Sequence, residues 1–357
     1  MSKYIIFPYV GLFLPLFSNA STLSTNFFSH SHSNIAPIKQ IIDDDWLEPP
    51  SPDADIGFSQ SLLEVKLDYN GYSLSSLNRL DYFLTANYDT ALAYYQNSRD
   101  IPLNSHKPYS ISLNFHEQKS RGIAFGYAID RQAWQASFQL SYWDVVKFRN
   151  SNLNGSITGN NTNEILGELT LDENYTHKNF LKRPNERSWN TSGYGYSANI
   201  AFEYIASDTF TLSLKASDLF NRFKYKMIGN TQAEINTKGS FVDNEGFSSF
   251  RPLLSGIESE RSFSKALPIS LNFGAKYTAS NIDYLFDFYR RANTSFYLVG
   301  AQYRAKHATI GIKYDIQNQV PELSLSTEWL NLLIALDTLD FKSAYNIKLG
   351  LNLNLHF

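Results

Sequence analysis

The chain has 357 residues and a net charge of -3, with no Cys, 18% charged residues and 15% aromatic residues. The lack of Cys excludes disulfide scaffolds, thiolate metal sites and cysteine nucleophiles, and a pI of about 6.2 gives no basic footprint for nucleic acid. After the first 20 residues, no apolar run reaches the roughly 18–20 residues that a membrane-spanning helix needs. These features exclude a polytopic helical membrane protein.

The N-terminus has the layout of a secretory signal peptide. Lys3 provides a positive charge, residues 4–17 are apolar, and small residues lead to Ala20. Pro8 and Pro15 argue against a buried helix here, because each removes a backbone donor. Residues 1–20 are therefore predicted to be cleaved, and the mature chain to leave the cytoplasm.

Residues 21–59 are rich in Ser, Asn, His and Pro and contain an acidic run at residues 43–45. This composition is typical of a linker or extension. We interpret the segment as an N-terminal periplasmic extension or a plug. His30 and His32 lie in a Ser-rich stretch, where solvent exposure is favoured over a metal site, so no metal or other cofactor is predicted.

From residue 60 to residue 357 the chain becomes a series of segments in which apolar and polar residues alternate, the pattern of a half-buried strand. We expect about 14 strands, within a range of 12–16. Residues 330–339 are the most helix-like run and are still interpreted as a strand. The clearest runs cover residues 109–116, 123–129, 134–142, 194–204, 210–214, 269–277 and 310–316, and less clear ones cover residues 61–74, 82–95 and 223–236.

Short and long connections alternate between these segments. Short turns are expected at residues 118–120 and 317–321, and long polar loops at residues 149–190 and 229–267. The first long loop includes a small hairpin near residues 165–171. Membrane barrels have this alternation, but soluble sandwiches share it.

The last segment separates these two alternatives. From Tyr345 to Phe357 apolar residues alternate with polar ones without a break, and the chain ends on an aromatic residue. In a soluble sandwich such a strand would be an aggregation-prone edge, whereas in a bilayer it has about the length that a tilted strand needs. Strands that cross a bilayer must also close into a barrel, because no backbone N–H can face lipid unpaired.

In this ending the chain resembles the outer-membrane β-barrels of Gram-negative bacteria. The resemblance implies an all-β, transmembrane, antiparallel up-and-down barrel, located in the outer membrane and in contact with its lipid. It also implies partners during biogenesis, namely periplasmic chaperones and the barrel-assembly machinery. That machinery would read a C-terminal signal made of Tyr345, Leu351, Leu353, Leu355 and Phe357. The layout is similar to 14-stranded barrels of the fatty-acid-transporter type, although the Asn-Pro-Ala motif of that family is absent.

In such a barrel the polar rows face the lumen, because charge on the lipid face would cost about 2–4 kcal/mol for Lys or Arg. Aromatic residues near strand ends, such as Trp143, are expected to form interfacial girdles. The charged rows could equally form an internal salt-bridge network without a role in transport. The candidate lumen residues are Glu203, Lys215, Lys276, Lys313, Asp315 and Lys348.

Function is predicted as the porin-like passage of a solute across the outer membrane. The alternative is a non-transporting barrel that serves as a scaffold or accessory of a surface or secretion system. A third hypothesis is a hydrolase, because Asn174–Asn179 is similar to the Tyr-x-His-x-Ser-Asn-Gly segment of the outer-membrane phospholipase. No Ser follows His177 in this segment, which continues Lys178-Asn179-Phe180, so the nucleophile is missing and no catalytic residue is predicted.

Overall fold

A computed structural model describes residues 21–160, 164–176, 192–237, 240–242, 248–250 and 253–357. The predicted signal peptide lies outside these residues. Strands dominate, and they form one 16-stranded sheet and a separate two-stranded hairpin. Neither helix in the described part of the chain is long and apolar enough to cross a membrane.

The elements of the first half alternate long strands with two helices. They are β1 (Ser21–Ser33), α1 (Ile38–Asp43), β2 (Ile56–Tyr69), β3 (Tyr72–Ala86), α2 (Tyr88–Ser98), β4 (Tyr109–Asp130), β5 (Trp134–Gly159), β6 (Ile165–Tyr175) and β7 (Ser192–Ser207).

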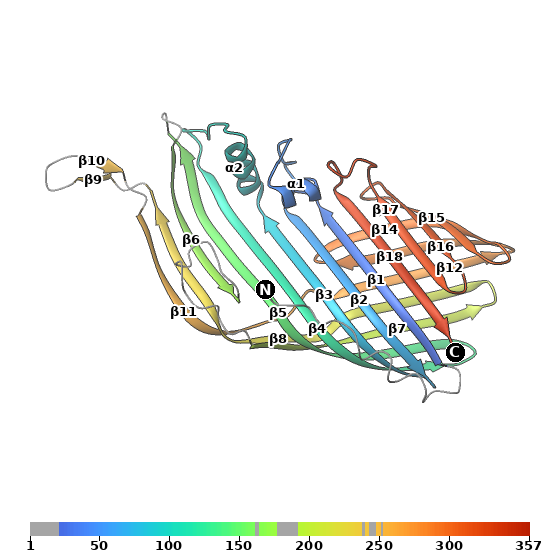
Figure 1. The fold of residues 1–357 in the computed structure, drawn as a ribbon. Helices are drawn as coiled ribbons and strands as arrows, with labels where there is room; N and C mark the ends of the chain where they lie inside the picture. The colour runs from blue at the N-terminus through green and yellow to red at the C-terminus, as the bar shows by residue number, and fades with distance from the viewer. Residues whose placement is uncertain (1–20, 161–163, 177–191, 238–239, 243–247, 251–252) are drawn as a thin grey trace, which may run out of the picture.

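The second half begins with the longest strand and continues with shorter ones (Figure 1). Its strands are β8 (Phe210–Asn236), β9 (Ser240–Val242), β10 (Ser248–Phe250), β11 (Leu253–Lys265), β12 (Ser270–Ala279), β13 (Ile282–Arg291), β14 (Thr294–Arg304), β15 (Thr309–Asp315), β16 (Val320–Ser326), β17 (Leu330–Leu336) and β18 (Asn346–His356).

The large sheet closes on itself as an antiparallel barrel of 14 strands. Closure is made by β1, which pairs with β18 on one side and with β2 on the other. From β2 the wall continues through β3, β4, β5, β7, β8 and β12, and then in chain order to β18. The predicted fold class and strand number are confirmed.

The interpretation of residues 21–59 as an extension or plug is wrong. Residues 21–33 are β1, an integral wall strand, and residues 34–55 form the loop that carries α1 at the end of the barrel opposite the C-terminus (Figure 1). The strand was missed because Ser and His replace apolar residues along it. Cross-strand pairs satisfy the hydroxyls of Ser29 and Ser31, whose Oγ atoms lie 2.8 Å from that of Ser61 and 2.7 Å from that of Ser59.

The helix α2 was also missed, because residues 82–95 were interpreted as one strand. That strand, β3, ends at Ala86, and Asn87 caps the helix by accepting a hydrogen bond from the backbone N–H of Thr90 at 3.1 Å. An Asn at this position satisfies one of the free N–H groups of the first turn. Ala91 and Ala93 form the buried side of α2, which is too small a stripe to stand out in the sequence.

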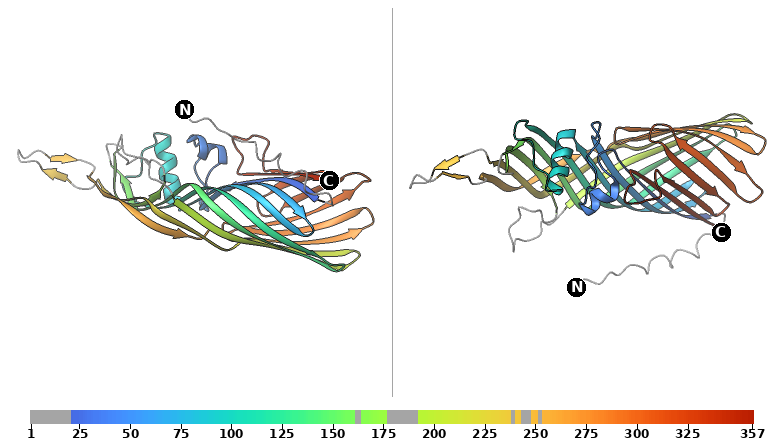
Figure 2. Two further views of the ribbon diagram at one scale, coloured as in Figure 1. Left: turned by 60° about the horizontal axis from the view of Figure 1, so that its bottom comes forward. Right: turned by 90° about the horizontal axis from the view of Figure 1, so that it is seen from above.

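Three predicted connections are partly strand. β5 continues through residues 149–159 and pairs there with β6, and the end of β8 pairs with both β6 and β11. The predicted turn at residues 118–120 lies inside β4, at a register shift. These extra lengths form a tall sheet on one side of the barrel, and the β9–β10 hairpin projects from it (Figure 2). The predicted turn at residues 317–321 is confirmed, because β15 ends before it and β16 begins within it.

Candidate functional site: the cavity of the barrel lumen

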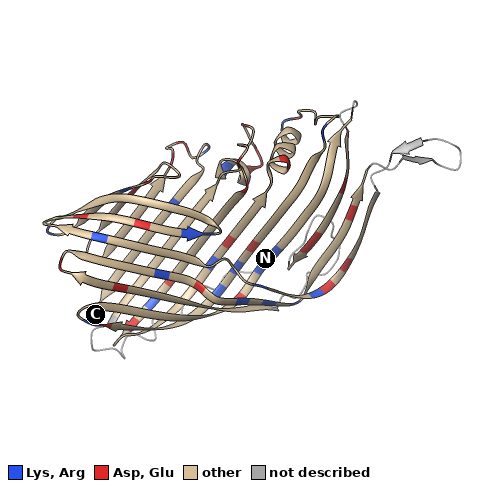
Figure 3. Cartoon of the chain, turned by 180° about the vertical axis from the view of Figure 1, so that it is seen from behind, with Lys and Arg blue, Asp and Glu red and all other residues tan. Residues whose placement is uncertain are grey.

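Inside the barrel lies a cavity of about 880 Å³. It reaches from Gly71, in the turn between β2 and β3, to the level of Arg79 and Asp218. Seven Lys and Arg and five Asp and Glu side chains line it, and Figure 3 shows how charged residues are spread along the wall strands. Apolar side chains such as Leu62 and Leu333 lie between them.

The end of the cavity that lies away from Gly71 contains an ion-pair network, and this network connects strands that are not neighbours in the wall. Arg79 of β3 donates to both carboxylate oxygens of Asp218 of β8, at 2.5 and 2.8 Å, although β4, β5 and β7 separate these strands in the wall. The Nε atom of Arg79 also donates to Asp81 at 2.7 Å, and Gln60 donates to the same carboxylate at 2.8 Å. All three charged groups are buried. The network therefore ties β3 to β8 across the lumen, past the three strands that separate them.

An irregular stretch of β8 positions Asp218. Its backbone φ is 62°, and the register between β7 and β8 shifts twice near this residue. Asp adopts this left-handed region more readily than most residues, because its short polar side chain can bond locally. Beside it, Asn221 donates to the backbone oxygen of Leu267 at 2.9 Å and accepts from the N–H of the same residue at 2.6 Å. The Asn221 side chain thus takes the place of backbone pairing at Leu267, where the chain passes from β11 to β12.

Above this network an aromatic cluster fills the lumen. The rings of Phe148 and Tyr225 stack with their centroids 3.8 Å apart, and Phe263 packs against both. Tyr225 donates a hydrogen bond to Gln118, which is fully buried. Trp143, expected in an outer girdle, instead faces inward and donates to the Ser197 hydroxyl at 3.0 Å.

The turn between β13 and β14 makes a second closure. Ala292 and Asn293 both have positive φ, which allows a tight turn. Beyond it, Phe296 is fully buried and contacts the rings of His30 and His32 on β1, at centroid distances of 5.1 and 5.3 Å. These strands lie far apart in the wall, so this contact also crosses the lumen. Both His residues are buried, contrary to the expected exposure.

The candidate lumen residues fall into three groups. Lys215, Lys313 and Lys348 line the cavity, and Lys313 and Lys348 share Glu322 as an ion-pair partner, at 3.3 and 2.6 Å. Asp315 is buried and accepts from the backbone N–H of Gln317 at 3.0 Å, so it belongs to the β15–β16 turn. Glu203 and Lys276 are half-buried and lie outside the lining of this cavity.

Sequence reasoning missed the residues that close the lumen, of which Arg79, Asp218 and Phe296 are the main ones. His177 lies outside the described residues. Within the part of the chain that is described, no group of three His, Asp or Glu side chains could hold a metal ion.

The outer face of the barrel carries large apolar side chains that are exposed. Ile123, Leu140 and Ile312 are 61, 52 and 58% exposed, and Leu351, Leu353 and Leu355 continue the row on β18. A closed barrel with a polar interior and an apolar outside is the arrangement that lipid requires of strands. The protein is an outer-membrane β-barrel. The role of the C-terminal residues as an assembly signal stays a prediction.

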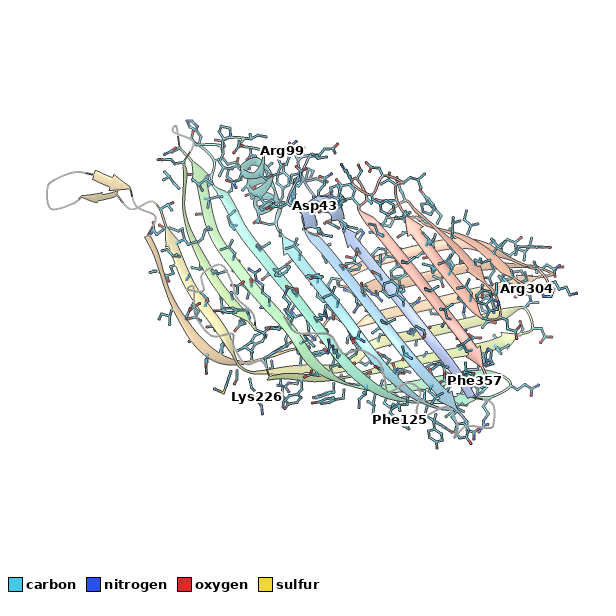
Figure 4. All side chains as sticks on the ribbon, viewed as in Figure 1. Asp43, Arg99, Phe125, Lys226, Arg304 and Phe357 are labelled. Atoms are coloured by element: carbon cyan, nitrogen blue, oxygen red, sulfur yellow. The ribbon has the colours of Figure 1, made fainter. Side chains whose placement is uncertain are left out.

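In an outer-membrane barrel the short turns lie on the periplasmic side and the long loops outside the cell. The turn at Gly71 and the C-terminal Phe357 therefore lie at the periplasmic end, and the loops that carry α1 and α2 lie at the outer end. Figure 4 places Phe125 and Phe357 toward the first end and Asp43 and Arg99 at the second. The cavity thus reaches toward the periplasm, and the aromatic closures lie on its outer side.

No protein-family model and no curated protein matches the sequence. Among solved structures, the chain is similar to a deletion mutant of the monoaromatic hydrocarbon channel TodX, with a TM-score of 0.45, 9% identity, and coverage of 94% of this chain and 89% of the other. It is also similar to the toluene transporter TbuX of Ralstonia pickettii, with a TM-score of 0.41, 7% identity and coverage of 96 and 90%. A FadL homologue of Pseudomonas aeruginosa is similar with a TM-score of 0.30 and 7% identity, and the match covers 94% of this chain and 88% of the other.

Proposed function

We propose that this barrel is a channel for a small solute, closed toward the outside in the described conformation. The single observation that supports this function best is the cavity of about 880 Å³ inside the wall, which reaches the periplasmic turns. Side chains just fill the interior of a barrel of about eight strands, whereas a wall of 14 strands encloses a space wide enough for a solute. The ion-pair network and the aromatic cluster consist of side chains, so their rearrangement would open a path from the cavity to the outer side.

The test is conductance of the purified protein in planar lipid bilayers. We expect small or rare current steps for the wild type and larger ones for a Phe148→Ala/Tyr225→Ala variant, which removes the stacked pair. Phe125→Ala is the matched control, because Phe125 is 56% exposed on the lipid face and leaves the lumen unchanged. Currents that stay absent in all three proteins, with folding verified by heat-modifiable migration in SDS gels, would contradict a channel.

One observation favours a different role, as a scaffold or accessory of a surface or secretion system. The tall outer sheet ends in β11, whose second edge pairs with no strand among the described residues. A free edge is a template for strand addition by another chain. Cross-linking through an introduced Cys at Ile257, which is 70% exposed, would capture such a partner on intact cells, whereas a channel needs none.

A further inference from the structure

Basic side chains lie on the outer surface of the wall, just beyond the lipid-facing apolar rows. On β4 the outward apolar row ends at Ile123, and the next two outward residues are Arg121 and Lys119. Both basic residues are exposed. They point outward because Gln118 and Ser120, which alternate with them, are buried on the inner side and bond to each other at 2.9 Å.

The outer half of β8 repeats this arrangement. Phe223 and Tyr225 are buried in the cluster that fills the lumen. Alternation therefore places Arg222, Lys224 and Lys226 on the outer surface, where all three are exposed. Figure 4 shows Lys226 on the outside of the wall.

The strand register aligns the two groups across β5 and β7. Arg121 is opposite Asp144 of β5, Asp144 is opposite Tyr194 of β7, and Tyr194 is opposite Lys224. Three strand spacings of about 4.8 Å place the two groups about 14 Å apart. They border one surface, which we call the outer basic patch and which consists of Lys119, Arg121, Arg222, Lys224 and Lys226.

The patch has more cations than carboxylates to pair with them. None of its five residues forms an ion pair with another described residue. Glu117 is engaged by Lys147 at 2.5 Å. Lys119 is directly opposite Lys147 in the register, a placement in which like charges destabilise the sheet. A bound anion would relieve this repulsion.

The surface next to the patch indicates which anion binds. On its periplasmic side Ile123, Tyr142 and Tyr196 are 61, 55 and 48% exposed, and Phe220 beside the patch is 82% exposed. Basic residues at the end of such rows lie at the membrane–water boundary, beside the lipid headgroups. An anionic lipid uses both surfaces, because its headgroup meets the cations and its acyl chains meet the apolar row.

We propose that the outer basic patch binds the headgroup phosphates of a phosphorylated lipid in the outer leaflet. Arg121 and Arg222 offer paired N–H donors to phosphate oxygens, and the lysines add point charges. The acyl chains lie along the row that contains Ile123, Tyr142 and Tyr196. This site faces lipid rather than the lumen, so it is independent of the proposed channel.

Titration of the purified full-length barrel in neutral detergent with EDTA tests the site. The probes are lipid A with two phosphates, its fully dephosphorylated form, and inorganic phosphate. The phosphorylated lipid should bind at least roughly tenfold more tightly than the dephosphorylated one, since several basic residues near a charged headgroup each contribute.

Lys224→Gln/Lys226→Gln should weaken binding of phosphorylated lipid A by roughly tenfold or more. The matched control is Arg131→Gln/Lys306→Gln, which removes the same charge from two exposed periplasmic turns and should keep the wild-type affinity. Heat-modifiable migration verifies folding, and Arg222→Gln is the second variant if the lysine pair misfolds.

Three results would overturn the site. They are equal affinity of the wild type for the two forms of lipid A, equal losses of affinity in the two double variants, and displacement of lipid A by inorganic phosphate at similar concentration. The first and third comparisons use the wild type alone, so they stand even if every variant fails to fold.

Discussion

Replacing Arg79 with Met should destabilise the barrel strongly. Arg79 is the direct ion-pair partner of Asp218 and Asp81, whose side chains are 5 and 0% exposed. Met fills a similar volume but leaves two buried carboxylates without a partner cation. Removing one partner of a buried ion pair costs about 3–5 kcal/mol. Because Arg79→Met leaves two carboxylates unpaired, its loss of stability should lie at the upper end of that range.

The matched control is Lys66→Met. Lys66 pairs with Asp68 at 2.9 Å on the same inner face, but its side chain is 31% exposed and that of Asp68 36%. Hydrated pairs contribute only about 0–1 kcal/mol. A third variant, Arg79→Met/Asp218→Asn, removes one of the two unpaired carboxylates and should recover part of the lost stability.

The measurement is urea unfolding of the barrel in phospholipid vesicles, followed by Trp fluorescence. We expect Arg79→Met to unfold at much lower urea than Lys66→Met, and the double variant to fall between them. If Arg79→Met and Lys66→Met lose equal stability, water reaches the network freely and the buried cross-lumen tie is refuted.

Four further predictions follow from the wall and its closures. Leu140→Arg, on the lipid face, should cost about 2–4 kcal/mol in the same urea assay. Phe296→Ala should raise single-channel conductance in planar bilayers, because it removes the contact with β1. Asp315→Ala should lower stability by about 1–3 kcal/mol, since the turn N–H groups lose their acceptor. Deleting Phe357 should reduce the folded, heat-modifiable form in outer-membrane fractions, while total synthesis stays unchanged.

The strand pattern was predictable wherever apolar and polar residues alternate cleanly. The runs at residues 123–129 and 134–142 lie within β4 and β5, because lipid and water demand opposite chemistry on successive residues. The same reasoning failed for β1, since Ser29 and Ser31 interrupt its apolar row and satisfy their hydroxyls across strands. The strand at residues 149–159 was predicted as a loop for a similar reason, because both faces of a strand can be polar outside the membrane.

The closures were not predictable from local pattern. Arg79 and Asp218 are 139 residues apart in the chain, and the curvature of the wall through β4, β5 and β7 brings β3 and β8 within reach of each other. In the sequence, Asp218 lies in a stretch whose alternation is broken by two register shifts. A long-range pair without a motif leaves no local signal, whereas alternation was enough to predict the cavity-lining Lys215, Lys313 and Lys348.

A single extra residue in β5 determines the chemistry of the lumen at its outer end. Below it, Ser141 and Trp143 face inward, and unbroken alternation would place Lys147 in the lumen as well. The register against β4 shifts between Val145 and Lys147, and such a bulge exchanges the two faces of the strand beyond it. Phe148 is consequently buried in the aromatic cluster, while Lys147 lies outside and pairs with Glu117 at 2.5 Å. The bulge therefore places an aromatic side chain of the closure, in place of a lysine, at the level where the polar cavity ends.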